Sequence, residues 1–188
     1  MPHRYFKLTD DVDIAGRWEL GEPVDPRGQE VDPWQFTQGM AVHVRERLRV
    51  PIKHPGKPLD FSFTSLATPV VHTQVATLLS QLAPDDVQFI PADIDSQPDP
   101  FCIFVATRLL RCIDDQRSTE VRYWKPEDGR PEKTGQYRSV YRLRIDPSQV
   151  GDAKIFRTWG WDIALIVSEE IKEALERIGA TGMRFKEV

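Results

Sequence analysis

The clearest structural signal in the sequence is an amphipathic segment near the C-terminus, between two segments of strand character. Ser168 stands where a helix N-cap is expected, and the two glutamates after it suit the positive end of a helix dipole. Gly179 stands at the usual C′ position, just past the end of the pattern. The segment therefore predicts a helix over about 169–178, with an apolar face made by Ile171, Ala174, Leu175 and Ile178.

Most of the remaining chain has the two-residue periodicity of β-strands. A second helix is expected over about 69–82, where Thr68-Pro69 has the form of a capped start and Pro84 ends the apolar pattern. The run Phe101–Ile113 begins almost continuously apolar, which favours a central strand. Many strands with two principal helices indicate an α+β fold with a mainly antiparallel sheet. The other expected strands are 4–8, 42–52, 59–63, 87–91, 120–124, 137–145, 153–158, 163–167 and 183–187, with a charged loop or hairpin tip at 125–136.

The N-terminal region is expected to be a long irregular arm. Residues 12–41 are rich in Gly, Pro and Asp, which disfavours a long regular element. The same region contains Trp18, Trp34 and Phe36, and aromatic side chains of this size gain too much by burial to stay in water. A length of 188 residues suits one domain. We therefore expect a single domain over 1–188, with an irregular arm at 1–41 packed by Trp18 and Trp34 onto an α+β body at 42–188.

No signature of a common enzyme class is present. The chain lacks GxGxxG, GxxxxGK[ST], HExxH and GxSxG motifs. The four histidines are not spaced as metal ligands. The acidic fragments 10–13 and 93–95 lack the other positions of a calcium loop. These observations favour a protein that is not an enzyme and that has no cofactor and no metal site.

Hydropathy indicates a protein of the cytoplasm. The longest apolar runs, Phe101–Ala106 and Ile163–Val167, are too short to cross a bilayer, and the first residues do not resemble a signal peptide. The two cysteines, Cys102 and Cys112, lie outside any CxxC motif and are expected to be reduced thiols. We therefore expect no membrane partner.

The negative charge of the chain is concentrated in one segment. The whole chain carries a net charge of −4, while residues 84–120 contain eight acids and three bases. An acidic surface can steer a basic partner, although solvated loops are the alternative interpretation. Arginines at 45–49, and arginines among tyrosines at 137–144, suggest a nucleic-acid surface. The acidic pI of about 5.6 and the lack of an RNP motif favour instead a solvated sheet face and no nucleic-acid partner.

A short turn contains two tryptophans, Trp159-Gly160-Trp161, followed by Asp162. Tryptophans around a glycine at a strand break are typical of core packing with a tight turn. In an extended strand both side chains lie on one side, because side chains repeat every two residues. They would then cover the core or line a shallow groove. The alternative to a binding protein is therefore a small-ligand-binding or hydrolytic enzyme with a site around Trp159, Trp161 and His43.

The C-terminal run IDPSQVGDAKIFRTWGWDIALIVSEEIKEALERIGATGMRF has a distinctive order. A strand with Phe-Arg is followed by an apolar strand ending in IVSEE, an amphipathic helix and a final strand. Together with the opening segments RYFKLTDDVD, GRWELG and VDPWQF, this order resembles immunity protein family eleven of bacterial polymorphic-toxin systems, formerly a domain of unknown function. The residues that carry the resemblance are Phe156, Arg157, Ile166, Val167, Ser168 and Glu169.

The resemblance implies a non-enzymatic inhibitor that binds a cognate toxin domain and occludes it, in the cytoplasm of the toxin producer and its kin. The resemblance implies no catalytic residues and does not indicate an oligomeric state. Many polymorphic toxins are nucleases, which tend to have basic surfaces, and an acidic inhibitor would mimic the charge of their substrate. The resulting hypothesis is a surface that binds a basic toxin through Asp85, Asp86, Asp95, Asp99, Asp114 and Asp115.

Overall fold

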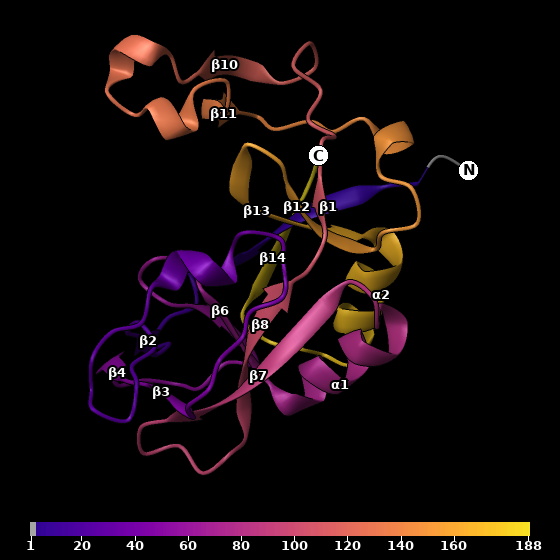
Figure 1. Cartoon of the computed structure of the whole chain (residues 1–188). Coiled ribbons are helices and arrows are strands. Elements are labelled where there is room, and N and C mark those ends of the chain that lie inside the picture. The colour runs from indigo at the N-terminus through magenta and orange to yellow at the C-terminus, as the bar shows by residue number, and fades with distance from the viewer. Residues whose placement is uncertain (1–2) are drawn as a thin grey trace.

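The computed structural model describes residues 3–188 and contains two five-stranded sheets and two helices (Figure 1). Sheet 1 contains, in spatial order, β14 (Met183–Glu187), β1 (Tyr5–Asp10), β13 (Trp161–Ser168), β12 (Ile155–Thr158) and β9 (Leu109–Leu110). Sheet 2 contains β3 (Leu48–Val50), β7 (Val87–Ile94), β8 (Phe101–Ala106), β6 (Pro69–His72) and β5 (Phe61–Phe63). Two-stranded sheets are formed by β10 (Thr119–Tyr123) with β11 (Tyr137–Tyr141), and by β2 (Glu19–Leu20) with β4 (Ile52–His54).

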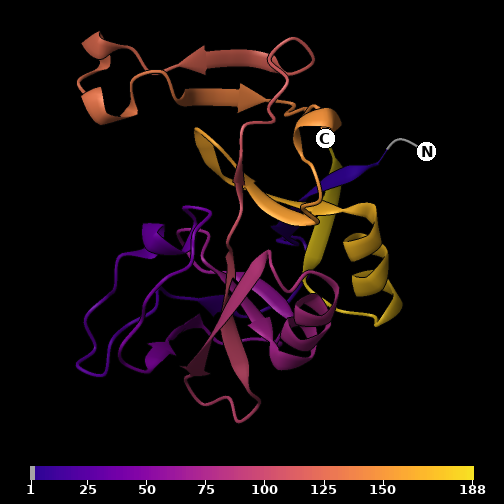
Figure 2. The ribbon, with the colours of Figure 1, turned by 45° about the vertical axis from the view of Figure 1, so that its right-hand side comes forward.

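The α+β prediction is confirmed, but the single, mainly antiparallel sheet is replaced by several sheets. Within sheet 1 only the β12–β9 pair is parallel, and within sheet 2 only the β3–β7 pair is parallel. The helices α1 (Thr73–Leu82) and α2 (Glu169–Arg177) lie together on one side of the molecule (Figures 1 and 2). Short 3-10 turns occur in the loops at Pro33–Phe36, Pro126–Asp128, Pro131–Lys133 and Pro147–Gln149.

One hydrophobic core is shared by the two sheets and the two helices. Leu8 and Leu165 of sheet 1 belong to the same buried cluster as Phe104 of sheet 2. The helices contribute their apolar faces to this cluster, and burial of each such side chain stabilises the fold by about 1.5–3 kcal/mol. These large buried side chains are Val75, Leu79, Ile171 and Leu175, and the smaller Ala76 belongs to the same cluster. The two sheets are therefore held to each other through a common interior.

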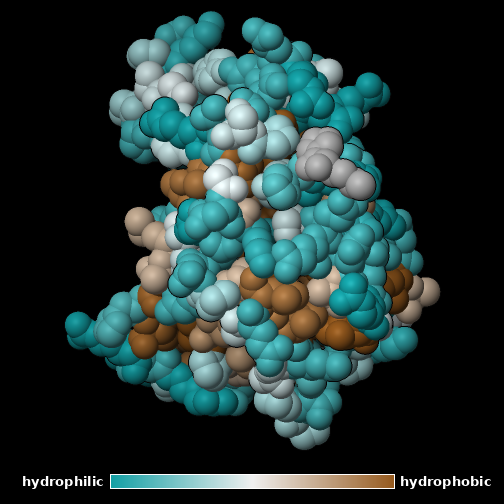
Figure 3. All heavy atoms as spheres, turned by 90° about the vertical axis from the view of Figure 1, so that its right-hand side faces the viewer, coloured by the Kyte–Doolittle hydropathy of each residue, from teal (hydrophilic) through white to brown (hydrophobic). Residues whose placement is uncertain are grey.

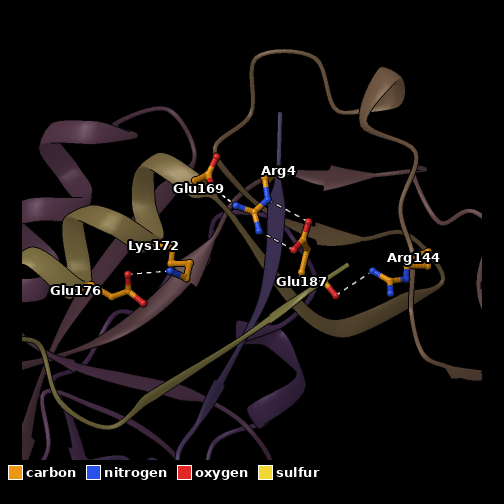
Figure 4. Close-up of polar contacts among 6 residues, drawn as sticks. All are labelled: Arg4, Arg144, Glu169, Lys172, Glu176 and Glu187. Atoms are coloured by element: carbon orange, nitrogen blue, oxygen red, sulfur yellow. Dashed lines mark hydrogen bonds and ion pairs between the residues drawn. The ribbon is translucent and has the colours of Figure 1, made fainter. Parts of the chain in front are cut away.

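Helix α2 forms where the sequence predicts it. The Ser168 hydroxyl accepts a hydrogen bond from the main-chain nitrogen of Ile171 at 3.4 Å, which caps the helix. The chain leaves the helix at Gly179, whose φ of +67° suits glycine. Arg4 donates to Glu169 at the start of α2, at 2.5 Å, and to Glu187 of β14, at 2.7 Å (Figure 4). These ion pairs are exposed and contribute orientation more than stability.

The expected start of the first helix at residue 69 is wrong. Residues 69–72 form strand β6, which lies between β8 and β5, and the helix begins only at Thr73. Val70 and Val71 are both buried, and their branched side chains suit a pleated strand that is covered on two faces. The imidazole of His72 caps the helix by accepting from the nitrogen of Gln74 at 3.1 Å.

The segment 101–113 is not one central strand. Residues 101–106 form the fully buried β8 in sheet 2, and after a break at Thr107–Arg108 the chain enters sheet 1 as the short β9. Cys112 follows in a third buried cluster, on the opposite face of sheet 1 from the shared core. This segment therefore carries the chain from one sheet to the other.

The long irregular N-terminal arm is not confirmed. Residues 5–10 form β1, inside sheet 1 between β14 and β13, and β2 pairs with β4. The rest of the segment covers the outer face of sheet 2, where Trp18 packs against Phe101 with ring centroids 5.4 Å apart. Phe36 is fully buried, whereas Trp34 is 48% exposed. Burial thus anchors the segment at Trp18 and Phe36 but not at Trp34.

The surface is largely polar on the side that carries the helices (Figure 3). In this view apolar atoms gather over the lower half, while the end that carries β10 and β11, at the top, is mostly hydrophilic. Among residues 3–188, no helix has the length and apolar character needed to cross a membrane.

Candidate interaction surface

The six acidic residues predicted to bind a partner lie in three separate places. Asp85 and Asp86 precede β7, Asp95 and Asp99 lie in the loop between β7 and β8, and Asp114 and Asp115 follow β9. The eight residues of β7 separate the first two places by about 25 Å, at a rise of about 3.3 Å per residue. The β7–β8 loop is at the bottom of Figure 1 and β10, which follows Asp115, is at the top. The structure does not bring the six carboxylates together.

Asp86 is an interior residue, 4% exposed. Its Oδ2 accepts from the main-chain nitrogens of Lys154 at 2.8 Å and Ile155 at 3.2 Å, and Arg108 lies 3.4 Å from Oδ1. The carboxylate therefore joins the start of β7 in sheet 2 to the start of β12 in sheet 1. Asp86 therefore does not belong to a surface that a partner can contact.

Substituting Asp86 by Ala should lower the free energy of unfolding by about 2–3 kcal/mol, because one buried and one partly buried N–H group lose their acceptor. Asp85→Ala is the matched control, since Asp85 is exposed and its side chain has no partner within residues 3–188. It should change the stability by less than about 0.5 kcal/mol. Urea unfolding of the two variants measures the difference, and equal stabilities would contradict the bridging role of Asp86.

Most of the other acids have partners in the chain. Asp95 forms an ion pair with Arg49 at 2.7 Å. Asp114 accepts from the main-chain nitrogens of Gln116 and Arg117, both at 3.0 Å. Asp115 accepts hydrogen bonds from the hydroxyls of Tyr123 and Tyr137. Asp85 and Asp99 are exposed, and neither carboxylate has a hydrogen-bonding or ionic partner within residues 3–188.

The most prominent element of the molecule is a ribbon made by residues 114–145, which extends from sheet 1 (Figures 1 and 2). Strands β10 and β11 pair antiparallel with an irregular register, and the tip contains the two 3-10 turns at 126–128 and 131–133. Its base is fixed by main-chain hydrogen bonds from Asp114 to Arg144 at 2.9 Å and from Asp146 to Cys112 at 2.7 Å. The ribbon is thus a defined projection.

Two tyrosines and one carboxylate hold the ribbon against its own base. Tyr123 and Tyr137 pack with ring centroids 4.9 Å apart, and both hydroxyls donate to Asp115, that of Tyr137 at 2.6 Å. Burial and then the hydrogen bond to Asp115 raise the pKa of Tyr137 well above its usual range, so the phenol stays protonated as a donor. Asp115 is therefore both an exposed acid and a structural acceptor.

The Trp159-Gly160-Trp161 turn supports the ribbon. The nitrogen of Tyr137 donates to the carbonyl of Gly160 at 3.0 Å, and a Cβ at Gly160 would lie 3.1 Å from the Tyr137 ring. Arg111 stacks on Trp159 in the same turn, with its guanidinium carbon 3.5 Å from the ring centroid. Trp159 and Gly160 therefore pack against Arg111 and Tyr137.

A buried arginine shapes the same turn. The register of the β12–β13 pair changes after Arg157, and the carbonyls of Asp162 and Ile163 accept from Arg157 Nη1 at 3.2 and 3.1 Å. Arg157 is fully buried, and this burial lowers its pKa to about 10. Arg157 thus has a structural role in holding an irregular strand.

The residues of the alternative enzyme site are not assembled. Trp161 lines a pocket of about 200 Å³ beneath the end of β11. His43 lines a different pocket, of about 300 Å³, beside Arg45 and Gln35. The two pockets share no residue, so His43 and the tryptophans do not form one catalytic constellation.

The net charge of the ribbon is positive. Residues 114–145 contain eight Lys and Arg and six Asp and Glu, in a chain whose net charge is −4. Within residues 3–188, no carboxylate lies within 4.0 Å of the charged nitrogens of Arg122, Lys125, Lys133 or Arg142. By contrast, Arg47 and Arg49 at β3 are paired with Asp93 and Asp95.

Exposed aromatic surface accompanies these cations. Tyr141 is 59% exposed and Tyr123 is 41% exposed. One side of the ribbon has a hollow of about 470 Å³, lined by Val121, Arg122, Tyr123, Lys125, Glu127, Asp128 and Arg138. Exposed Tyr and Arg are the residue types enriched where proteins bind one another. We therefore take the ribbon as the candidate interaction surface.

The sequence predicts the two strands of the ribbon and the loop between them, but from sequence its Arg and Tyr residues are interpreted as a solvated sheet face and not as a partner-binding surface. The signal was present as Arg and Tyr interleaved at 137–144. The arginines at 45–49 have the same appearance in sequence, but Arg47 and Arg49 have acidic partners in space, so composition alone does not separate the two sets.

A protein-family model described as Immunity protein family (Imm11) matches residues 6–188. This range covers both sheets, both helices and the ribbon. No curated protein matches the chain in sequence.

Proposed function

The chain belongs to the Imm11 immunity protein family, and we propose that it binds and neutralises the toxin domain encoded beside it. The observation that carries this proposal is the family match, which extends over residues 6–188. We propose further that it acts in the cytoplasm of the toxin producer and inhibits by occupying the toxin, without catalysis.

The ribbon supports binding as the mode of action. It presents unpaired cations and exposed tyrosines on a projection whose base is fixed by Asp115 and by the Gly160 turn. A surface that is already ordered loses little conformational entropy on binding. We propose that the toxin contacts this ribbon.

The acidic residues define a second contact hypothesis for the same function. The members of the predicted set that are exposed or partly exposed are Asp85, Asp95, Asp99, Asp114 and Asp115, and a basic toxin surface, such as that of a nuclease, would suit them. If they provide the contact, the variant D85N/D99N should bind the toxin more weakly and with a flatter salt dependence. Unchanged affinity would remove the acids from the interface.

Inhibition without catalysis has a direct test. The purified toxin domain from the adjacent reading frame is titrated with this protein while the toxin activity is measured. Inhibition should be complete at a fixed molar ratio near one, and mass spectrometry should find the toxin covalently unchanged. Full inhibition by a small substoichiometric amount, or a modified toxin, would indicate an enzyme and would overturn the proposal.

A further inference from the structure

Two lysines face each other on adjacent strands of sheet 1. Lys7 of β1 and Lys186 of β14 are direct partners in the antiparallel ladder. Side chains at such positions lie on one face with their Cβ atoms about 5 Å apart, and like charges there are destabilising. Lys7 is half-buried, and its burial, followed by the charge of Lys186, lowers its pKa.

A third cation reaches the same place from the ribbon. Arg142 follows β11 with a φ of +45°, a conformation that L-residues seldom adopt. The chain turns there toward sheet 1, and Arg142 lines one pocket together with Lys7 and Lys186. A strained backbone that places a charge beside two like charges is a sign of a functional site.

The structure provides no counter-charge for this cluster. Within residues 3–188, no acidic side chain lies within 4.0 Å of the charged nitrogens of Lys7, Arg142 or Lys186. The neighbouring acid Glu187 points to Arg4 instead, at 2.7 Å (Figure 4). Its main-chain carbonyl accepts from Arg144 at 3.4 Å.

The walls of the pocket are apolar and aromatic. Trp161, Tyr141 and Val140 line it beside the three cations. Apolar walls reduce the local dielectric, which strengthens the attraction of these cations for an anion. The volume of about 200 Å³ is below the range of about 300–1,000 Å³ typical of small-molecule sites. The space therefore suits one side chain of a protein better than a free ligand.

We propose that this pocket, formed by Lys7, Arg142 and Lys186 against Trp161 and Tyr141, receives an Asp or Glu side chain of the cognate toxin. The inference rests on the proposed function and adds the contact chemistry. A carboxylate in the pocket gains charge-assisted hydrogen bonds and removes the repulsion between the lysines. Acids interspersed along the ribbon, such as Glu120 and Glu127, would repel the uniform charge of a nucleic acid, which favours a protein partner.

The test is titration calorimetry of the toxin domain from the adjacent reading frame against wild type and the variant R142Q/K186Q. Both side chains are exposed, so the fold should be kept, and loss of the repulsion should leave the melting temperature equal or higher. Affinity for the toxin should fall roughly 30-fold or more. The control R45Q/K57Q removes the same charge from exposed positions elsewhere and should stay within about 3-fold of wild type.

Three other results would each overturn the proposal. If wild type binds the toxin and R142Q/K186Q binds as tightly as R45Q/K57Q, the pocket is not a contact, while the proposed function stands. If wild type forms no complex, both fail. If wild type instead binds an RNA oligonucleotide and R142Q/K186Q does not, the pocket recognises phosphate and not a toxin carboxylate.

Discussion

Substituting Gly182 by Ala is expected to lower the free energy of unfolding by about 3–5 kcal/mol, because a Cβ would overlap the backbone and no side chain can yield. The added atom would lie 2.1 Å from the carbonyl oxygen of Phe61, and the φ of Gly182 is +92°. At this point the chain enters β14 of sheet 1 while the nitrogen of Phe61 donates to Thr181 at 3.1 Å. The substitution should therefore separate the edge of sheet 1 from sheet 2.

Gly179→Ala is the matched control for this effect. Gly179 also has a positive φ, of +67°, but nothing lies within 4 Å of the added Cβ. The backbone strain alone should cost about 1 kcal/mol. Thermal unfolding should show a fall in melting temperature of about 10 °C or more for Gly182→Ala and about 3 °C for Gly179→Ala. Equal shifts would show that strain, and not the close approach of the two segments, makes glycine necessary.

Shortening the ribbon should abolish most of the affinity for the toxin and leave the fold intact. Trp124 and Gln136 are joined by a main-chain hydrogen bond of 2.9 Å, so residues 125–135 can be replaced by Asn-Gly, which suits a two-residue hairpin turn. Tyr123, Tyr137 and Asp115 remain to hold the shortened ribbon. Removal of Lys125 and Lys133 with the tip should weaken binding about 100-fold, the effect expected when a main contact is lost.

The control shortens the other exposed hairpin. Replacing residues 96–99 by Asn-Gly trims the β7–β8 loop and removes Asp99. Surface plasmon resonance with immobilised toxin should show near-normal binding for this variant. The reverse result, with the ribbon variant binding normally and the loop variant failing, would place the contact at the acidic loop and contradict the role of the ribbon.

The elements that sequence predicted well depend on local chemistry. Helix α2 has its cap, its apolar face and its terminal glycine within one short stretch, and it forms as expected. The strands of the ribbon and the loop between them are also close to the predicted ranges. In each case residues near in sequence decide the outcome.

The errors arise where tertiary context decides. The pattern after Pro69 is apolar enough for a helix, but the position between β8 and β5 makes residues 69–72 a strand. The run 101–113 is rich in apolar residues because it passes from the buried clusters of sheet 2 to that of sheet 1, and a single central strand would give a similar pattern. Trp34 is as apolar as Trp18, yet only Trp18 is buried where the N-terminal segment packs on sheet 2.

The candidate site was even harder to predict from the sequence. A count of acids in 84–120 does not reveal that Asp86 is buried or that Asp95 has a partner in Arg49. Lys7 and Lys186 lie near opposite ends of the chain, and only the register of β1 with β14 brings them together. A cluster of like charges made by strand pairing has no local signature.

The central claim is that this protein forms a stable inhibitory complex with its cognate toxin. The most direct measurement is titration calorimetry of the two purified proteins at two salt concentrations, with toxin activity measured in the same mixtures. We expect one-to-one binding that weakens as salt rises, because unpaired charges on this protein meet opposite charges on the toxin, and loss of activity in step with complex formation. No heat of binding and an undiminished toxin activity, with both proteins folded, would contradict the claim.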